Sequence, residues 1–194
     1  ASIEAALRSA HRVPEKERLL IHAWKEVMDG RSADGHALYE RAVESFPQDK
    51  EVLFMAGDQW LHEEEPARAL PYFERAVALD GTFEPALMHQ ADCLAHLGRI
   101  EELAEVARRW TERAPSGASF RALATAHGSE GRVEDAIAAA RRALELDGTS
   151  YSRTLLAEGL ILGGRHAEAE ALLRPFAGPT ASLLDRRHSV ATLA

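Results

Sequence analysis

The chain has 194 residues, of which 46% are hydrophobic and only 6% aromatic, and its formal net charge is −8. This apolar content allows a sizeable core, and the abundance of Ala favours closely packed helices over a sheet. The negative charge, without a concentrated basic surface, excludes nucleic acid as the expected partner. No stretch approaches the roughly 20 apolar residues of a membrane helix, so we expect no membrane partner.

Residues that stop helices recur along the chain every 33 or 34 positions: Pro14, Pro47, Gly81, Pro115 and Gly148. Pro ends a helix because it lacks an N–H group, and Gly because it readily adopts positive φ. A second series of glycines marks the turn inside each unit: Gly30, Gly98, Gly131 and Gly164. In the central unit Glu64 takes the turn position, and we expect Pro66 to begin the next helix.

The two series predict a single domain built from helical hairpins. Its expected parts are an N-terminal helix or half repeat, five repeats and a C-terminal cap or tail: 1–15, 16–49, 50–83, 84–116, 117–149, 150–183 and 184–194. Because Pro14 is in phase with the later stops, residues 1–15 look like the second helix of a repeat whose first helix is absent. The alternative is a separate N-terminal capping helix, and under either interpretation we expect the natural chain to continue upstream.

The central unit shows the pattern most completely. Its apolar residues follow helical spacing on two successive helices: Leu53, Ala56, Gly57 and Trp60, then Ala69, Phe73 and Ala76. We expect the helices to cross most closely at Gly57 and Ala69, with Trp60 and Phe73 filling the space on either side. Neither helix can bury its own apolar stripe.

This spacing of large, small and aromatic residues resembles the tetratricopeptide repeat. The resemblance implies an all-α fold, a right-handed α-solenoid of antiparallel helical hairpins, with an inner groove lined by the first helix of each hairpin. A narrower resemblance, in PEKERLLIHAW and YERAVESFPQDKEVLFMAGD, is to the repeat arrays of bacterial signalling proteins.

Three local features depart from a regular array. Trp110 stands where a small residue is usual, so either the packing opens locally or the ring lies at its edge. Pro175 is expected to end the last second helix about a turn early. The tail after Thr180 carries Leu183, Leu184, Val190 and Leu193 and reads as a terminal cap, with a frayed end or a docking segment as alternatives.

The resemblance also implies which side chains line the groove. Carried onto this sequence, the groove offsets are Leu20, Trp24, Phe54, Asp58, His62, Met88, Asp92, His96, Arg121, Thr125 and Glu158, with Met28, Ser129, Thr154 and Leu162 at further offsets.

These groove residues suggest the chemistry of a partner. Some members of the family hold a C-terminal carboxylate with Lys, Asn and Arg at such offsets. In this sequence the matching positions include Leu20, Phe54 and Met88, so that carboxylate clamp is missing. Apolar residues with a row of acids favour a basic or amphipathic peptide or partner helix. The alternative is that the acids are merely solvated and the aromatics half-packed.

No catalytic or metal-binding motif stands out. Asp58 with His62 and Asp92 with His96 form two i, i+4 pairs, but neighbouring repeats lie about 10 Å apart, too far to share one ion easily. We therefore expect no metal and no cofactor, and the lack of a phosphate loop or nucleophile motif predicts that the protein is not an enzyme. The single cysteine, Cys93, is expected to pack in the core, and it fits a cytoplasmic protein.

The predicted function is a non-catalytic scaffold for protein–protein interaction, binding a peptide or partner helix in a concave groove. One alternative is a regulatory or sensor segment of a larger bacterial signalling protein, such as a kinase, cyclase or transcription regulator. Another is self-association through incompletely capped ends or the tail.

Overall fold

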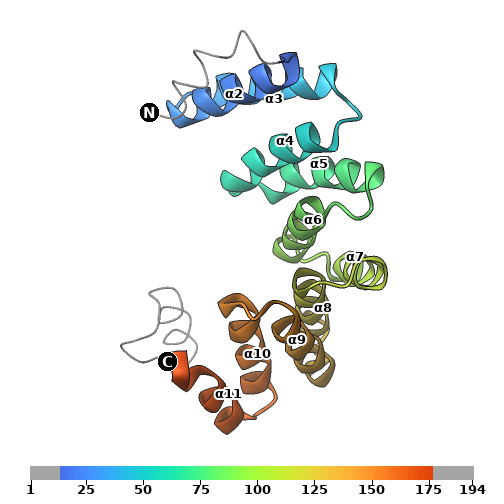
Figure 1. The fold of residues 1–194 in the computed structure, drawn as a ribbon, viewed down its shortest axis with the longest axis vertical. Helices are drawn as coiled ribbons and strands as arrows, with labels where there is room; N and C mark the ends of the chain where they lie inside the picture. Colours follow the sequence, from blue (N-terminus) through green and yellow to red (C-terminus); the bar gives the residue numbers. More distant parts are fainter. Residues whose placement is uncertain (1–13, 177–194) are drawn as a thin grey trace. The chain divides into compact units, whose positions relative to one another are not determined.

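The computed structural model describes residues 14–176, which form ten α-helices and one short 3-10 helix and contain no strand (Figure 1). The helices are α2 (Glu15–Met28), α3 (Ser32–Ser45), α4 (Lys50–His62), α5 (Pro66–Leu79), α6 (Glu84–His96), α7 (Ile100–Arg113), α8 (Gly117–Ser129), α9 (Val133–Asp147), α10 (Ser150–Leu162), α11 (His166–Leu173) and η2 (Arg174–Phe176). The N-terminal helix expected over residues 1–15 falls almost entirely outside the described residues, and the tail expected over 184–194 falls wholly outside them.

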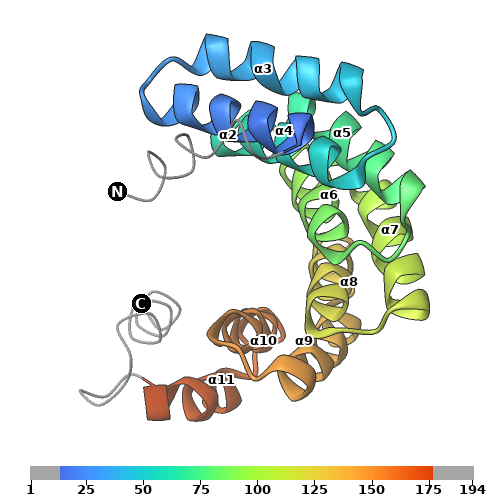
Figure 2. The ribbon, with the colours of Figure 1, turned by 45° about the horizontal axis from the view of Figure 1, so that its top comes forward.

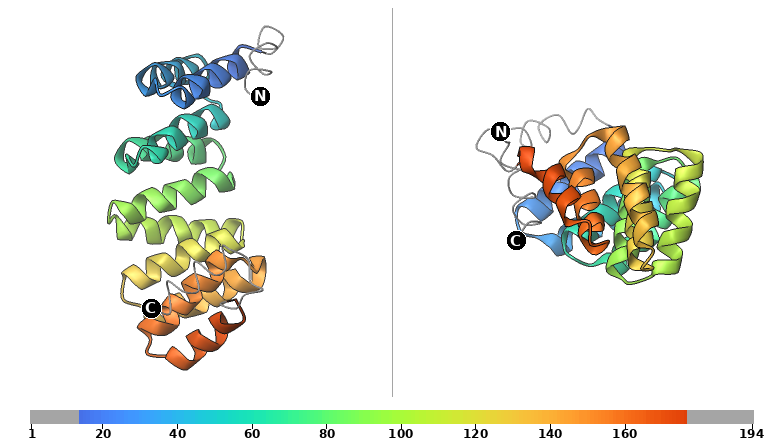
Figure 3. Two further views of the ribbon diagram at one scale, coloured as in Figure 1. Left: turned by 90° about the vertical axis from the view of Figure 1, so that its left-hand side faces the viewer. Right: turned by 90° about the horizontal axis from the view of Figure 1, so that it is seen from below.

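Contacts along the chain divide it into two compact units, residues 1–93 and 94–194. In the first unit the α2–α3 hairpin packs against the α4–α5 hairpin (Figure 2). In the second, α7 packs on α8, the α8–α9 hairpin packs on α10, and α10 packs on α11, drawn from yellow to red in Figure 3. The limits of the individual repeats stay a prediction.

The five turns inside the described hairpins share one backbone geometry. A residue with positive φ occupies each turn, and the next residue donates its N–H to the carbonyl five positions earlier: Arg31 to Glu26, Glu65 to Trp60, Arg99 to Leu94, Arg132 to His127 and Arg165 to Leu160. This is the bond that closes a helix whose last carbonyls need partners. Four turns use glycine and the fifth uses Glu64, at φ 59°, which confirms the turn position predicted for Glu64.

Local sequence signals place several helix ends. Asp49 accepts hydrogen bonds from the backbone of Glu51 and Val52 at the start of α4, and Ser116 forms a capping box at the start of α8. Helix α5 begins at Pro66, as predicted. At the other end of the chain, α11 stops at Leu173, just before Pro175.

The α4–α5 crossing is as close as its small residues predict. A Cβ atom on Gly57 would lie 3.0 Å from the ring of Phe73 and from the Cβ atom of Tyr72, and Ala69 is fully buried. Trp60 packs within its own hairpin, where the Arg68 guanidinium of α5 lies 3.5 Å from its ring centroid, and it also stacks on His36 of α3, with 3.5 Å between ring centroids. The indole therefore fills space beside the α4–α5 crossing and also joins this hairpin to the preceding one.

Trp110 is almost fully buried on α7, so the expectation that its ring could lie at an edge is wrong. Helix α8, which packs on α7, buries only small side chains on its first turns, including Gly117, Ala118 and Ser119. Small neighbours leave room for a large ring without separating the helices.

The turn at Glu64 generates a stability prediction. A left-handed backbone conformation at a non-glycine residue lowers the free energy of unfolding by about 1–2 kcal/mol. Glycine removes this strain, but its greater conformational freedom in the unfolded chain offsets part of the gain. We expect Glu64→Gly to raise the free energy of unfolding by about 0.5–1 kcal/mol, measured by urea denaturation. Gly98→Glu, the reverse change in the equivalent turn, should lower it, and a loss of stability in Glu64→Gly would contradict this account.

Candidate functional site

The structure exposes several large apolar side chains, and most of them lie on the first helices of hairpins. Among the described residues, Trp24 and Met28 on α2 are 42% and 64% exposed, and Tyr151 and Leu162 on α10 are 56% and 72% exposed. The others lie at ends of second helices or in a turn: Leu79, Leu97 and Leu146. Large exposed apolar side chains gathered on a face often mark a binding surface.

In the first unit, the exposed residues form a stripe on α2. Leu20, Trp24 and Met28 follow one another at intervals of four, so they share a helical face. Leu20 is half-buried at one end of the stripe, and exposure increases toward Met28. These three residues form an apolar strip on the surface of α2.

Phe54, another predicted groove residue, is largely used within the first unit. Its ring centroid lies 5.9 Å from that of Phe73, 5.8 Å from that of Phe83 and 5.5 Å from that of His89. The half-buried ring is thus held by an aromatic cluster. It can offer an edge to a partner, but it is not a free anchor.

The two acids predicted for the first unit are linked by a histidine that the sequence reasoning missed. His89 Nε2 lies 3.4 Å from an oxygen of Asp58, and His89 Nδ1 lies 3.8 Å from an oxygen of Asp92. Asp58 also lies 3.4 Å from His62, its predicted i, i+4 partner. His89 stands three residues before Asp92, and that i, i+3 spacing was the available signal.

In the second unit, a pocket of about 240 Å³ opens between α8, α9 and α10. Predicted groove residues form part of its wall: Thr125, Ser129, Glu158 and Leu162, together with Ala124, Gly128, Ala136, Leu155 and Gly159. The pocket is hollow because its lining from α8 is small. A Cβ atom added to Gly128 would meet no atom within 4 Å.

Arg121 is committed to an internal ion pair. Its guanidinium pairs with the carboxylate of Asp147 at the end of α9 and lies 3.3 Å from the hydroxyl of Ser152. Gly117 makes room for this contact, since a Cβ atom there would collide with Asp147. Arg121 thus connects hairpins and is not poised to bind a ligand.

Similar pairs recur in the first unit. Lys16 Nζ lies 3.0 Å from Asp49, and Lys50 Nζ lies 2.5 Å from Asp80. Each cation stands near the start of a first helix and reaches an acid that precedes the next one. These cations therefore already have carboxylate partners within the chain.

The remaining predicted groove residues differ in exposure. Met88 is half-buried on α6, while His62 and His96 are exposed at the ends of α4 and α6. Within residues 14–176, no three His, Cys, Asp or Glu side chains group as a metal site would require. Cys93 is fully buried, and burial together with Asp92 raises the pKa of its thiol to about 12.

The helices of the described residues are too short or too polar to cross a membrane. This finding concerns α2 to α11 and η2 only.

Comparison with known proteins gives one family. The family model described as tetratricopeptide repeat matches residues 23–82, 64–118 and 121–181, which together exceed half of the chain. No curated protein matches the chain at a significant level.

Several solved structures are similar in fold. A thermophilic TPR protein of Thermus thermophilus, TTC0263, is 22% identical with a TM-score of 0.72, covering 92% of this chain and 98% of its own. PilW, a type IV pilus biogenesis factor, is 18% identical with a TM-score of 0.74, covering 97% and 88%. YrrB, a TPR protein with an unusual peptide-binding site, is 13% identical with a TM-score of 0.63, covering 98% of both chains. These likenesses confirm an all-α solenoid of helical repeats.

The environment of Asp147 generates a pH prediction. Burial alone would raise the pKa of this carboxyl, but hydrogen bonds from Thr149 and Ser152 and the charge of Arg121 lower it below its ordinary 3.8. A lowered folded-state pKa stabilises the fold above pH 3.8, and this stabilisation is lost as the pH falls through the folded-state value.

We expect Asp147→Asn to lower the free energy of unfolding by about 1–2 kcal/mol at pH 7, and by less as the pH is lowered below 4. Urea titrations at several pH values measure the difference. Glu112→Gln is the matched control, because Glu112 lies outside the proposed sites and forms an exposed ion pair with Arg108. An equal cost for Asp147→Asn at pH 7 and pH 3 would rule out the ionic explanation.

Proposed function

The chain belongs to the tetratricopeptide repeat family, and from this premise we propose that it binds a partner protein or peptide on the first helices of its hairpins. Two surfaces carry the proposal, one in each unit. The first is the stripe of Leu20, Trp24 and Met28 on α2. The second is the pocket of α8, α9 and α10 beside Leu162.

The observation that supports the proposal most strongly is the exposure of Trp24 and Met28. Apolar surface removed from water is worth roughly 25 cal/mol per Å², so a side chain as large as tryptophan gains substantially from being covered. Exposed aromatic residues of this size are the usual anchors of protein interfaces. On α2 the anchor lies on a rigid helix, which reduces the entropy lost on binding.

The chemistry around the surfaces favours a basic or amphipathic partner. Asp58 and Asp92 place acidic groups in the first unit, and Glu158 lines the pocket of the second. The basic side chains Lys16, Lys50 and Arg121 pair with acids of the chain itself. A partner helix with apolar anchors and Lys or Arg residues would complement these surfaces.

We also propose a reducing compartment such as the cytoplasm for this interaction. The support is the single cysteine of the chain, Cys93, whose thiol is buried in the first unit. A free thiol kept in the core needs no oxidising environment.

Trp24 provides the first test. Random 16-residue peptides displayed on phage are selected on the unaltered protein, and enriched peptides are measured by fluorescence anisotropy. For a peptide held on α2, Trp24→Ala should weaken affinity at least about tenfold, because a central aromatic anchor is worth about 2 kcal/mol. Leu79→Ala is the matched control, since Leu79 is 45% exposed on a second helix.

Gly128 provides the second test. Gly128→Leu fills the pocket without meeting a neighbour at its Cβ atom, and so should abolish binding of peptides held in the second unit. Gly128→Ala keeps most of the space and should stabilise α8 by about 0.5–1 kcal/mol. The proposal fails if no peptide is enriched, or if enriched peptides bind both Trp24→Ala and Gly128→Leu as tightly as the unaltered protein.

A further inference from the structure

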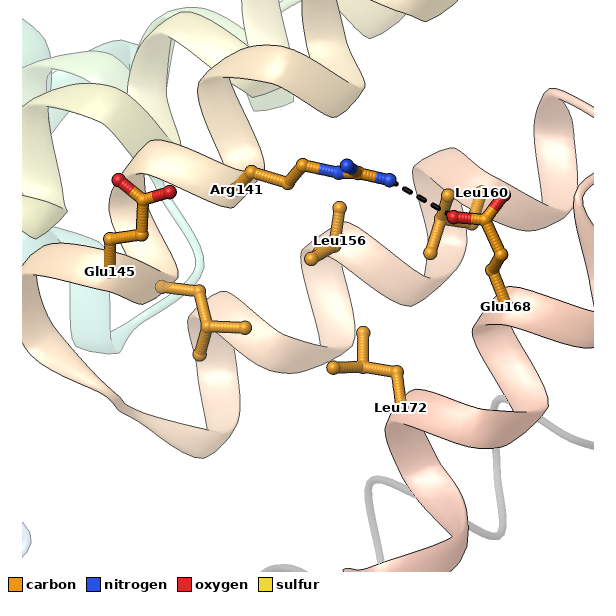
Figure 4. Close-up of a pocket in the computed structure, with 7 residues that line it drawn as sticks. Arg141, Glu145, Leu156, Leu160, Glu168 and Leu172 are labelled. Carbon is orange, nitrogen blue, oxygen red and sulfur yellow. Dashed lines mark hydrogen bonds and ion pairs between the residues drawn. The ribbon is translucent and has the colours of Figure 1, made fainter.

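The second unit has another pocket, of about 370 Å³, outside the proposed binding surfaces. It lies between α9, α10 and α11, and Figure 4 shows its lining: Arg141, Leu144, Glu145, Leu156, Leu160, Glu168 and Leu172. Four of these seven are leucines. On α10, Leu156 and Leu160 are different residues from Leu155, Glu158 and Leu162, which line the first pocket, so this inference does not rest on the proposed function.

The early end of α11 accounts for the opening. Helix α11 begins at His166, 33 residues after Val133 begins α9, but it has 8 residues where α9 has 15. At that spacing Leu144 on α9 corresponds to residue 177, beyond the last residue of α11. Helix α11 therefore supplies no neighbour at the level of Leu144.

We propose that this leucine-lined pocket is the docking site of the chain's own segment 180–194. The segment contains Leu183, Leu184, Val190 and Leu193, which supply apolar side chains of the kind the pocket would bury. It follows closely on Leu172, which forms one wall of the pocket. Seven residues separate Leu183 from Phe176, and an extended chain of that length reaches about 23–25 Å.

Charge supports the same occupant. The rim carries Glu145 and Glu168, which are at least half exposed, and the segment contributes Arg186 and Arg187 beside only Asp185. Both acids already have partners: Glu168 lies 3.1 Å from Arg141, a pair drawn across the pocket in Figure 4, and is also bound by Arg165, while Glu145 pairs with Arg142. Exposed pairs of this kind contribute little individually and can be exchanged for others, so incoming arginines can share these acids.

Covalent attachment favours the chain's own segment over a separate molecule. A segment joined by a short linker is present at an effective concentration in the millimolar range near its site. A second copy of the chain would have to compete with this at the much lower concentration of the protein itself. The segment therefore occupies the pocket first.

The test uses the full chain with selectively labelled leucine methyl groups observed by NMR. In the double variant that combines Leu183→Asp and Leu184→Asp, we expect the methyl chemical shifts of the pocket leucines to change: Leu144, Leu156, Leu160 and Leu172. The methyl chemical shifts of Leu155 and Leu162 should stay the same. Ala181→Asp with Ser182→Asp adds the same charge to the same segment without removing a large apolar side chain. It should leave the pocket methyls unchanged. Equal changes in both double variants, or none in either, would overturn the proposal.

A spin label distinguishes the possible occupants. Cys93 is the only cysteine and is buried, so a label on Ser189→Cys reports one position. We expect it to broaden the methyl signals of Leu144 and Leu172 within one molecule, and Arg186→Glu with Arg187→Glu to reduce that broadening at least twofold. The proposal is wrong if broadening appears only when labelled and unlabelled molecules are mixed, which indicates a second copy. It is equally wrong if the broadening falls on Leu155 and Leu162, or on no leucine.

Discussion

The structure depends on the burial that neighbouring hairpins provide for one another. In the second unit, Gly159 of α10 lies close enough to α9 that an added Cβ atom would be 3.2 Å from the side chain of Ile137. Ile137 belongs to the same buried cluster as Leu156, Leu160 and Leu173, so the cluster spans two hairpins. No hairpin of such a stack can hide its apolar side alone, and each addition stabilises the one before it.

This constraint also explains why function can sit on the first helices. A side chain of the stack that stays exposed can contact another molecule, and Trp24 and Leu162 are 42% and 72% exposed. Helix α10 has a second role, since Leu156 and Leu160 line the pocket proposed for the chain's own segment. The same short helix thus contributes to an internal contact on one side and to the proposed partner surface on the other.

Much of the fold could be predicted from the sequence because its signals are local. Gly57 could be placed at a helix crossing from spacing alone, and Glu64 could be assigned to a turn because glycines occupy the same position in the other hairpins. These features depend on backbone conformation and on side-chain size, which the residue type fixes. Periodic repetition then strengthens each local signal.

The side-chain partners of the candidate site could not be predicted in the same way, because they join residues of different helices. Its offset predicts that Arg121 lines a groove, and the structure pairs it with Asp147, 26 residues away. His89 was overlooked although it lies between Asp58 and Asp92. The pocket beside Gly128 is the space that the side chains of α8, α9 and α10 together leave unfilled. Such features depend on where two elements meet, and spacing along one helix does not specify this.

The central claim is that hairpins are stable only in the stack, and native-state hydrogen exchange tests it most directly. The α4–α5 hairpin is compared within the full chain and as an isolated peptide of residues 50–83. The account predicts slow exchange at the amides of Leu53 and Phe73 in the full chain and unprotected exchange in the peptide. A peptide that protects these amides as strongly as the full chain does would contradict it.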